Sequence, residues 1–460
     1  MNNNIIEYFK STENKRIAFC GLGRSNLPLI DMYKSYGAMV IACDKRTPEA
    51  LDGLAESLSE KGVELSLGEK YLDNLDCDIL FRTPGMNYNM PELAELRQKG
   101  IKVTSEMEMF FELCPCKIIA VTGSDGKTTT TTIISEFLKA QGKTVHLGGN
   151  IGRPLLPEIF DIDKDDYAVV ELSSFQLISM TKSPDVAIVT NVTPNHLDVH
   201  KDMDEYIEAK RNIVKYQNKD SVTVLNYCND ITKSFSDGLC SEVRFFNADT
   251  DRDSVFLKDG IITFKHNNEY TDVLDTKDIA IPGAHNVENY MTAIGAVWGL
   301  VDIQTIRKVA REFGGVAHRA ELVRTLNGVR YYNDSIASSP TRTIKGTLSL
   351  FEQKIILICG GYDKNIPYAP LGPVINEKVK VLILIGATAD KIEKAVSEAD
   401  NYNSELRIIH AGSMDEAVSI AKAEAQNGDI VSLSPASASF DMYRDFEQRG
   451  EHFKSLVNNL

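Results

Sequence analysis

Apolar residues recur along this chain in short continuous runs, separated by longer segments with helical periodicity. The runs are rich in Val, Ile and Leu, and they occupy residues 16–21, 39–44 and 77–85, then 117–123, 167–174 and 185–192, then 354–361, 379–386 and 429–437. Such runs, alternating with amphipathic helices, are typical of strands in parallel sheets that are buried on both faces. The pattern therefore predicts an α/β protein with three successive parallel sheets.

One region departs from this pattern. Residues 243–270 alternate apolar and polar positions, which predicts β-hairpins added to the middle sheet. We place domain boundaries near residues 115 and 316, where one series of strands gives way to the next. The expected architecture has a Rossmann-like domain over residues 1–115, a central P-loop ATPase-like domain over residues 116–316 and a Rossmann-like C-terminal domain over residues 317–460.

Composition narrows the possible functions. The 460 residues are 43% hydrophobic and 25% charged, which suits a folded protein of two or three domains. A net charge of −15 argues against a nucleic-acid-binding or membrane-binding surface, because nucleic acids and many membranes are anionic. The eight cysteines include no C-x-x-C pair, which favours reduced thiols in a cytosol, and Cys114 and Cys116 are expected only to pack. No segment reaches the length of a membrane span, so we expect a cytoplasmic protein without membrane insertion.

The most informative stretch is KIIAVTGSDGKTTTTT, in which an apolar run ends in a glycine loop, a lysine and hydroxyl residues that begin a helix. Backbone N–H groups around Gly123, Asp125 and Gly126 can bind phosphate oxygens at the helix N-terminus. Lys127 can reach the β- and γ-phosphates, and Thr128 is placed to bind Mg²⁺. The spacing G-x-x-G-K-T is shorter than that of common P-loops. A glycine turn beside a solvated lysine would explain the motif only if all these features coincided by chance.

The first sheet carries a weaker signal. Its first apolar run ends in a tight glycine turn, and its second ends in Asp44, followed by Lys45 and Arg46. The turn resembles a dinucleotide-binding fingerprint, but its motif is G-x-G-x-x-N, and a plain β-turn explains it equally well. A helix N-terminus after this turn could bind a diphosphate with help from the two cations. Gly85 ends the third run at the same edge of the sheet.

Three further residues belong to the middle sheet. Glu171 and His196 follow apolar runs, and Lys210 lies in a later helical segment. Taken singly, each has an ordinary structural explanation: Glu171 as a helix cap, His196 as a polar loop residue and Lys210 as a solvated lysine. Asp198 and His200, beside His196, are expected to be loop and helix-cap residues. Beside a P-loop, however, Glu171 and His196 become candidate magnesium ligands, because the carboxyl ends of parallel strands meet at one edge.

Lys210 poses an electrostatic problem in such a site. An ammonium group roughly 5 Å from a divalent ion, at an effective dielectric constant of about 20, would be repelled by about 6 to 7 kcal/mol. The amine would have to be deprotonated, turned away or converted by CO₂ to a carbamate, whose negative charge could bind the metal.

The chain resembles the Mur ligase family in nine segments, which are TGSDGKTTT, GGNIGRP, ELSSFQL, NVTPNHLD, EAKR, PGAHNVENYMTA, HRAE, NDS and SPASASFDMYRDFEQRG. They follow the family's order over essentially the whole chain, and the last is most similar to members that add D-glutamate to UDP-N-acetylmuramoyl-L-alanine. The resemblance implies an ATP-dependent amide ligase of peptidoglycan precursor synthesis that acts through an acyl phosphate. It also implies three domains, for the UDP-sugar, ATP and the amino acid, and two Mg²⁺ ions. Separately from the resemblance, we expect a monomer.

The resemblance assigns roles to particular residues of this sequence. The catalytic residues would be Lys127, His196 and Lys210. The metal ligands would be Thr128 and Glu171 for one ion, and His196 with a carbamylated Lys210 for the other. The ATP contacts would be Gly123, Ser124, Asp125, Gly126, Lys127, Thr128, Thr129, Asn286, Asn289, Arg319 and Asp334. The UDP-substrate contacts would be Arg24, Ser25, Asp44, Lys45, Arg46, Gly85, Asn150 and His196. The amino-acid contacts would be Ser338, Lys364, Ser439 and Phe446.

The amino-acid site departs from the family's pattern at two places. Ile336 stands where the family usually has a lysine after N-D-S, and Tyr362 and Asp363 differ from other members in GGYDKN. Lys364 still offers the positive charge that a D-glutamate carboxylate requires. The exact contacts of the amino acid are therefore left open.

Other functions also remain open from the sequence. Another Mur-type ligase would use the same chemistry on a different substrate. Folylpolyglutamate synthases resemble the middle and last thirds of the chain but lack a uridine-binding domain like residues 1–115. A regulatory P-loop ATPase would hydrolyse ATP without an amino-acid acceptor, and a dinucleotide-binding module would bind a nicotinamide cofactor, which we expect to be absent.

Overall fold

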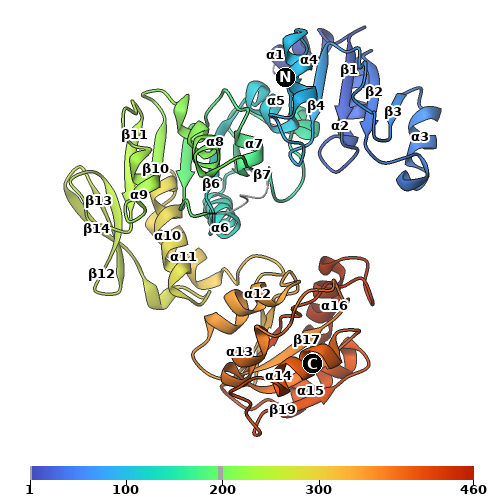
Figure 1. Ribbon diagram of the computed structural model, residues 1–460. Helices are drawn as coiled ribbons and strands as arrows, with labels where there is room; N and C mark the ends of the chain where they lie inside the picture. Colours follow the sequence, from blue (N-terminus) through green and yellow to red (C-terminus); the bar gives the residue numbers. More distant parts are fainter. Residues whose placement is uncertain (1–2, 195–199) are drawn as a thin grey trace. The chain divides into compact units, whose positions relative to one another are not determined.

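The computed structural model describes residues 3–194 and 200–460 and contains three β-sheets in that part of the chain (Figure 1). Two compact units are distinguished by their internal contacts. The first comprises Met1–Asp278 with Val287–Val309, and the second comprises Ile279–Asn286 with Ala310–Leu460. The first two sheets lie in the first unit and the third sheet lies in the second.

The first sheet has five parallel strands in the order β3-β2-β1-β4-β5. Successive residues of β1 face opposite sides, so that Ile17 and Phe19 join one hydrophobic core and Ala18 and Cys20 join another. Both faces are therefore buried, as the continuous apolar runs predict. The strands are β1 (Arg16–Cys20), β2 (Met39–Asp44), β3 (Glu64–Leu67), β4 (Ile79–Arg82) and β5 (Lys102–Thr104), and the helices are α1 (Asn3–Lys10), α2 (Leu27–Ser35), η1 (Glu49–Leu51), α3 (Leu54–Glu60), α4 (Pro91–Gln98) and α5 (Glu106–Leu113).

The second sheet has nine strands in the order β14-β13-β12-β11-β10-β9-β6-β8-β7. The neighbouring strands β7, β8, β6, β9, β10, β11 and β12 pair in parallel. At the opposite edge of the sheet from β7, β12, β13 and β14 pair antiparallel as hairpins. The strands are β6 (Lys117–Thr122), β7 (Val145–Gly149), β8 (Tyr167–Glu171), β9 (Val186–Val189), β10 (Val222–Asn226), β11 (Glu242–Phe246), β12 (Ser254–Lys258), β13 (Ile261–His266) and β14 (Glu269–Asp275). The helices are α6 (Lys127–Ala140), η2 (Leu156–Asp161), α7 (Ser174–Leu177), α8 (Met203–Lys215), α9 (Asp230–Ser234), η3 (Thr276–Asp278), α10 (Ala284–Val297) and α11 (Ile303–Glu312).

The third sheet has six strands in the order β15-β16-β20-β17-β18-β19, of which only the pair β15 and β16 is antiparallel. Ile356 and Ile358 of β17 face one core, and Leu357 and Cys359 face the other. The strands are β15 (Glu321–Leu326), β16 (Val329–Asn333), β17 (Ile355–Gly360), β18 (Val379–Ile385), β19 (Arg407–His410) and β20 (Ile430–Leu433), and the helices are α12 (Pro340–Thr343), η4 (Ile344–Leu348), α13 (Leu371–Lys378), α14 (Ala389–Ser397), α15 (Met414–Glu424) and α16 (Phe446–Asn458).

The predicted fold class is confirmed, because each of the nine apolar runs contains a strand and the sheets are predominantly parallel. The hairpins predicted over residues 243–270 are present as β12, β13 and β14, although β11 in the same region is a parallel strand. The boundaries near residues 115 and 316 stay predictions. Among the described residues, no helix is both long and apolar enough to span a membrane.

Two buried ionisable residues connect elements of the first two sheets. Arg82, at the end of β4, donates Nη2 hydrogen bonds to the Phe175 carbonyl at 2.9 Å and to Ser179 Oγ at 2.6 Å. Glu106, at the start of α5, accepts backbone hydrogen bonds from Leu155 and Leu156 at 2.8 and 2.9 Å. Burial raises the pKa of Glu106 to about 7, although these two N–H groups oppose the shift.

Glu106 should make the stability of the protein depend on pH. The pKa of Glu106 in the folded state lies above its ordinary value, so between these two pKa values the folded chain binds more protons than the unfolded chain. The free energy of unfolding therefore falls as pH rises from the pKa of the unfolded state to that of the folded state. The difference between about 7 and the ordinary 4.5 corresponds to about 3 kcal/mol. We expect Glu106→Gln to be more stable than the wild type at about pH 8 and to lose this advantage near pH 5, measured by chemical denaturation. Glu60→Gln, at an exposed position of α3, should show no such crossover.

Candidate functional site

The predicted phosphate-binding loop connects β6 to α6 at the carboxyl edge of the second sheet. Gly123 has φ of 150° and Gly126 has φ of 80°, values that favour glycine. A Cβ atom on Gly123 would lie 1.8 Å from Thr190 Oγ1, and one on Gly126 would lie 2.7 Å from Asn289 Oδ1. The two glycines therefore allow neighbouring side chains to approach the loop backbone, and the loop ends at the helix N-terminus as the sequence predicts.

The other loop residues are held by specific hydrogen bonds. Ser124 Oγ donates to the Thr193 carbonyl at 2.9 Å and lies 3.0 Å from the Tyr206 hydroxyl. The Asp125 N–H donates to Asn191 Oδ1 at 2.9 Å, and Thr190 Oγ1 donates to the Asp125 carbonyl at 2.6 Å. The segment after β9 therefore holds the loop in place. The sequence analysis gave no role to Thr190 or Asn191, although Asn191 begins the segment NVTPNHLD.

A carboxylate lies beside the first turn of α6. Glu171, the last residue of β8, is 2% exposed and accepts hydrogen bonds from Thr128 Oγ1 and Asn150 Nδ2, both at 2.7 Å. Hydroxyl and carboxylate oxygens are the ligands that Mg²⁺ prefers, and one or two carboxylates with phosphate oxygens usually complete its site. Thr128 and Glu171 therefore fit a magnesium ion bound to a nucleotide.

Two lysines share one carbonyl of the loop. Lys127 Nζ donates to Gly123 O at 2.9 Å and to Ser124 O at 3.0 Å, and Lys210 Nζ donates to Gly123 O at 2.8 Å. Lys210 lies on α8 and is 2% exposed. Burial, reinforced by the charge of Lys127, lowers the pKa of Lys210 to about 7. Much of this amine is therefore neutral near neutral pH, which is the form that can add CO₂.

His196 lies outside the described residues, as does Asp198, so the predicted second group of metal ligands is described only at Lys210. His200 is 4% exposed, with Nε2 2.8 Å from Ser174 Oγ and Nδ1 3.0 Å from Glu205 Oε1. Its ring stacks on Phe175 with centroids 5.0 Å apart. These contacts explain His200 as a buried residue that joins α7 to the start of α8.

The residues predicted for the UDP-substrate fall into two groups. A hollow of about 130 Å³ is lined by Arg24, Ser25, Pro84 and Asn150, and Gly85 follows Pro84 in the chain.

Asp44 does not line this hollow, and its carboxylate instead binds the glycine turn after β1. Its carboxylate accepts hydrogen bonds from Arg46 at 2.8 and 2.9 Å and from the Leu22 N–H at 2.8 Å. Burial disfavours the charged form, but these bonds outweigh it and lower the pKa of Asp44 to about 2. Lys45 is exposed.

The predicted adenosine residues Asn286 and Asn289 lie in α10. Asn289 Oδ1 accepts a hydrogen bond from Thr130 Oγ1 at 3.1 Å, so Asn289 lies beside α6. Thr129, the residue before Thr130, is half-buried.

The predicted nucleotide residues Asp334 and Arg319 belong to the second unit. Burial raises the pKa of Asp334 to about 6, although its carboxylate accepts hydrogen bonds from Thr347 and Ser434. Arg319 is exposed.

The predicted amino-acid residues follow parallel strands of the third sheet or begin α16. Ser338 and Ile336 follow β16, the exposed Lys364 follows β17, and Ser439 follows β20, while Phe446 is the first residue of α16. The carboxyl ends of these parallel strands meet at one edge, which brings the loops together.

Arg449 connects these loops, and the sequence analysis did not single it out although it lies in the segment SPASASFDMYRDFEQRG. It is fully buried and donates hydrogen bonds to Ser335 Oγ and to the carbonyl oxygens of Ser335, Ser437 and Ala438, at 2.8 to 3.2 Å. Burial lowers the pKa of Arg449 to about 10, so it stays charged at neutral pH.

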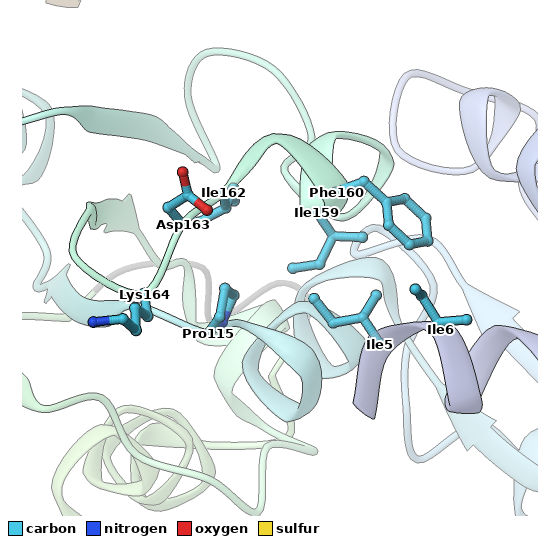
Figure 2. A pocket seen from close by; sticks show the side chains of 8 residues that line it. All are labelled: Ile5, Ile6, Pro115, Ile159, Phe160, Ile162, Asp163 and Lys164. Carbon is cyan, nitrogen blue, oxygen red and sulfur yellow. The ribbon is translucent and has the colours of Figure 1, made fainter. Parts of the chain in front are cut away.

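A larger hollow lies elsewhere in the first unit. Its volume is about 360 Å³, and it lies beside α1, Pro115 and residues 159–164. Figure 2 shows the side chains that line it, most of which are apolar. The side chains are those of Ile5, Ile6, Pro115, Ile159, Phe160, Ile162, Asp163 and Lys164. None belongs to the phosphate loop, so this hollow is distinct from the nucleotide site.

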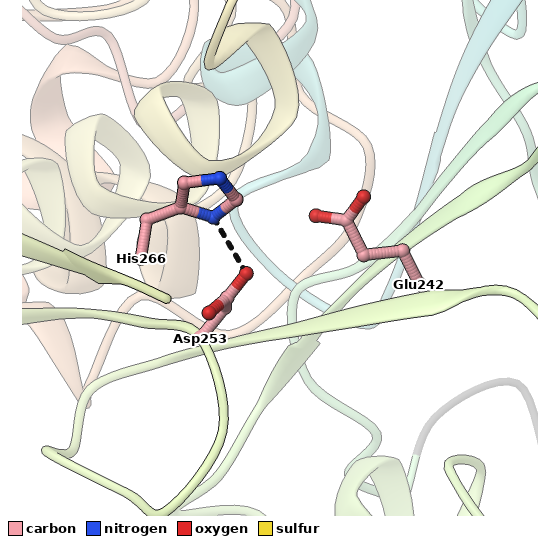
Figure 3. A group of neighbouring side chains, drawn as sticks. All are labelled: Glu242, Asp253 and His266. Atoms are coloured by element: carbon pink, nitrogen blue, oxygen red, sulfur yellow. Dashed lines mark hydrogen bonds and ion pairs between the residues drawn. The ribbon is translucent and has the colours of Figure 1, made fainter. Parts of the chain in front are cut away.

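Glu242, Asp253 and His266 form a cluster among β11, β12 and β13 (Figure 3). His266 Nδ1 lies 2.7 Å from Asp253 Oδ2, and Arg244 Nε donates to Glu242 Oε1 at 2.6 Å. An arginine that already neutralises one carboxylate disfavours a bound cation. The cluster is explained as an ion-pair network between neighbouring strands.

Comparisons with known proteins place the chain in a family. The family described as Mur ligase middle domain matches residues 121–297, and the one described as Mur ligase, glutamate ligase domain, matches residues 318–437. A UDP-N-acetylmuramoylalanine--D-glutamate ligase of Acetivibrio thermocellus is 53% identical over the full length of both chains, and one of Ruminiclostridium cellulolyticum is 49% identical over the same extent. The chain belongs to the Mur ligase family.

Mur ligases are ATP-dependent ligases, and membership of this family implies ATP and Mg²⁺ as cofactors. Solved structures support the fold. A UDP-N-acetylmuramate-alanine ligase from Thermotoga maritima has a TM-score of 0.57 at 17% identity, covering 97% of this chain and 100% of its own. A UDP-N-acetylmuramoyl-L-alanyl-D-glutamate–2,6-diaminopimelate ligase has a TM-score of 0.56 at 17% identity, covering 98% of this chain and 93% of its own.

Replacement of Gly123 by alanine should disrupt nucleotide binding. The new Cβ would meet Thr190 Oγ1 at 1.8 Å, so either the loop or the β9 segment must move. We expect ATP affinity to fall by at least about tenfold, or about 1.4 kcal/mol, by isothermal titration calorimetry. Gly142→Ala is the matched control, because Gly142 has φ of 84° but no atom within 4 Å of the added carbon. Wild-type ATP affinity in Gly123→Ala would contradict this account of the loop.

Proposed function

We propose that this protein joins D-glutamate to UDP-N-acetylmuramoyl-L-alanine in an ATP-dependent reaction of peptidoglycan precursor synthesis. The observation that carries the proposal is the ATP-site geometry of Gly123, Thr128 and Glu171 in a chain with 53% identity to a relative of that name. The N-terminal region supports a UDP-sugar substrate over a folylpolyglutamate, because Arg24 and Ser25 line a hollow with Asn150 of the ATP-binding sheet.

The reaction would proceed in two steps. The substrate carboxylate attacks the γ-phosphorus of ATP, the bond to the β-phosphate oxygen breaks, and ADP leaves. The resulting acyl phosphate is attacked by the neutral amine of D-glutamate, and the tetrahedral intermediate expels phosphate to leave an amide. Lys127 neutralises charge on the transferring phosphoryl group, and the backbone N–H groups at the start of α6 bind its oxygens.

We assign Thr128 and Glu171 to one Mg²⁺ ion, which would offset the negative charge of the phosphates. A second ion would be bound by His196 and a carbamate on Lys210. The lowered pKa of Lys210 and its position at the Gly123 carbonyl support this assignment, because a neutral amine can react with CO₂ and a charged one would repel the metal.

The remaining contacts are proposed from the family pattern. Asp44, Lys45, Arg46 and Gly85 would bind the uridine diphosphate with Arg24 and Ser25, and Ser124, Asp125 and Thr129 would contribute to the ATP site. Asn286, Asn289, Arg319 and Asp334 would bind the adenine nucleotide. Ser338, Lys364, Ser439 and Phe446 would bind D-glutamate. This division follows the proposed domains 1–115, 116–316 and 317–460.

The net charge of −15 gives no support to a nucleic-acid partner. We further propose that the protein acts in the cytoplasm as a monomer. Its substrates would be the UDP-linked precursor, D-glutamate and ATP.

One assay tests the proposed activity directly. The purified protein should release phosphate from ATP only when UDP-N-acetylmuramoyl-L-alanine and D-glutamate are both present, and mass spectrometry should detect their amide product. Omission of either substrate, or replacement of D-glutamate by L-glutamate or diaminopimelate, serves as the control. Phosphate release that ignores both substrates would instead favour a regulatory ATPase, and product formation with another amino acid would favour a different ligase.

Lys210→Ala should remove one ligand of the second metal ion. We expect the rate of amide formation to fall by about 100-fold or more, and short carboxylates such as acetate to restore part of it by occupying the vacated position. Lys215→Ala, on an exposed position of the same helix, should keep wild-type activity. A fully active Lys210→Ala variant would remove Lys210 from the metal site.

A further inference from the structure

Two cysteines lie together in the segment that connects α5 to β6. Cys114 and Cys116 flank Pro115, and their Sγ atoms are 3.5 Å apart. Cys114 is half-buried, whereas Cys116 is only 7% exposed. Pro115 also lines the apolar hollow of Figure 2, so this segment borders an opening in the surface. The sequence analysis predicted only a packing role for the pair.

We propose that Cys114 and Cys116 form a thiol–disulfide exchange site for low-molecular-weight disulfides, in which Cys114 attacks and Cys116 resolves. The difference in exposure sets this order, because an incoming disulfide can reach Cys114 more readily than Cys116. The 3.5 Å separation then places the second thiol beside any adduct formed on the first. This site is independent of the ATP-binding residues.

The surroundings of the two thiols favour the same order. The hydrogen bond from Cys116 lowers the pKa of Cys114, and the charge of Lys182 acts in the same direction, although burial and Asp185 oppose them. Lys182 is held nearby by a hydrogen bond from Nζ to the Phe111 carbonyl at 3.1 Å. The bond to Cys114, together with burial, raises the pKa of Cys116. The positive charge of Lys182 thus favours the thiolate of Cys114, which is the nucleophilic form.

The exchange balances without any oxidant beyond the disulfide itself. The Cys114 thiol loses a proton, its sulfur attacks one sulfur of oxidised glutathione, and one glutathione thiolate leaves and takes up a proton. The Cys116 thiol then loses a proton, attacks the Cys114 sulfur and expels the second glutathione. The protein is oxidised by two electrons and the small disulfide is reduced. The Sγ atoms must approach from 3.5 Å to about 2.05 Å for the disulfide to form.

Oxidised glutathione is the probe that tests this site. The full-length protein also has exposed thiols at Cys228 and Cys240, so the experiment uses the Cys228→Ser/Cys240→Ser variant as its background. We expect this background to lose two titratable thiols without retaining glutathione, and digestion with mass spectrometry to locate the new disulfide between residues 114 and 116. Direct mapping of the oxidised wild-type chain provides the same readout without any substitution.

Two single substitutions in that background test the order of the steps. Cys116→Ser should retain one glutathionyl group on Cys114, because the resolving thiol is missing. Cys114→Ser should leave Cys116 unmodified, because Cys116 is buried. Thermal denaturation and circular dichroism verify that each variant is folded. The proposal is overturned if the background keeps all of its thiols, if the disulfide forms elsewhere, or if Cys116 is glutathionylated when Cys114 is absent.

Discussion

The proposed nucleotide site depends on the close approach of Gly123 to the segment that follows β9. Thr190 and Asn191 bind the backbone of Asp125 through their side chains, and this is possible because Gly123 has no side chain to separate the two segments. The backbone N–H groups at the start of α6 are held in place by these bonds before any phosphate arrives. Such preorganisation avoids part of the entropic cost of ordering a loop when ATP binds.

The same constraint explains the unusual position of Lys210. The Gly123 carbonyl accepts hydrogen bonds from both Lys127 and Lys210, so two amines converge on one oxygen. Two ammonium groups that bind the same oxygen would repel each other strongly. Lys210 is the more buried of the two lysines, so its charged form is the less favourable one. The loss of a proton from Lys210 relieves this repulsion without breaking its bond to the carbonyl, since a neutral amine still donates.

The interior strands were more predictable than the edge strands for a physical reason. Strands such as β1, β6 and β17 are buried on both faces and must be continuously apolar. Edge strands such as β3, β7 and β19 lack one neighbour and contain Ser, His, Gly or Arg, so they leave no clear run. β10 is an interior strand that was also missed, because its buried Thr223 interrupts the apolar pattern and is satisfied by Gln217 and Ser241.

Within the site, the residues that the sequence could predict are those with a chemical motif or a strand end. Thr128 and Glu171 are 43 positions apart, yet parallel strands bring them within 2.7 Å. Thr190 and Arg449, whose hydrogen bonds go mainly to backbone carbonyl oxygens, were not predicted, because neither residue suggests a catalytic or metal-binding role from its type and position in the sequence. Their partners are defined by the folded chain and not by spacing in the sequence.

Arg449 illustrates what such a residue contributes to the third sheet. Its hydrogen bonds go to hydroxyl and carbonyl oxygens, which satisfy the guanidinium group but leave its positive charge in place. Burial lowers its pKa only to about 10, so the charge persists at neutral pH. The strand-end loops that carry Ser338 and Ser439 are therefore held around a buried cation. Arg449 thus contributes positive charge at this edge even though Ile336 replaces the lysine usual in the family, and this charge supports the proposed binding of an acidic amino acid.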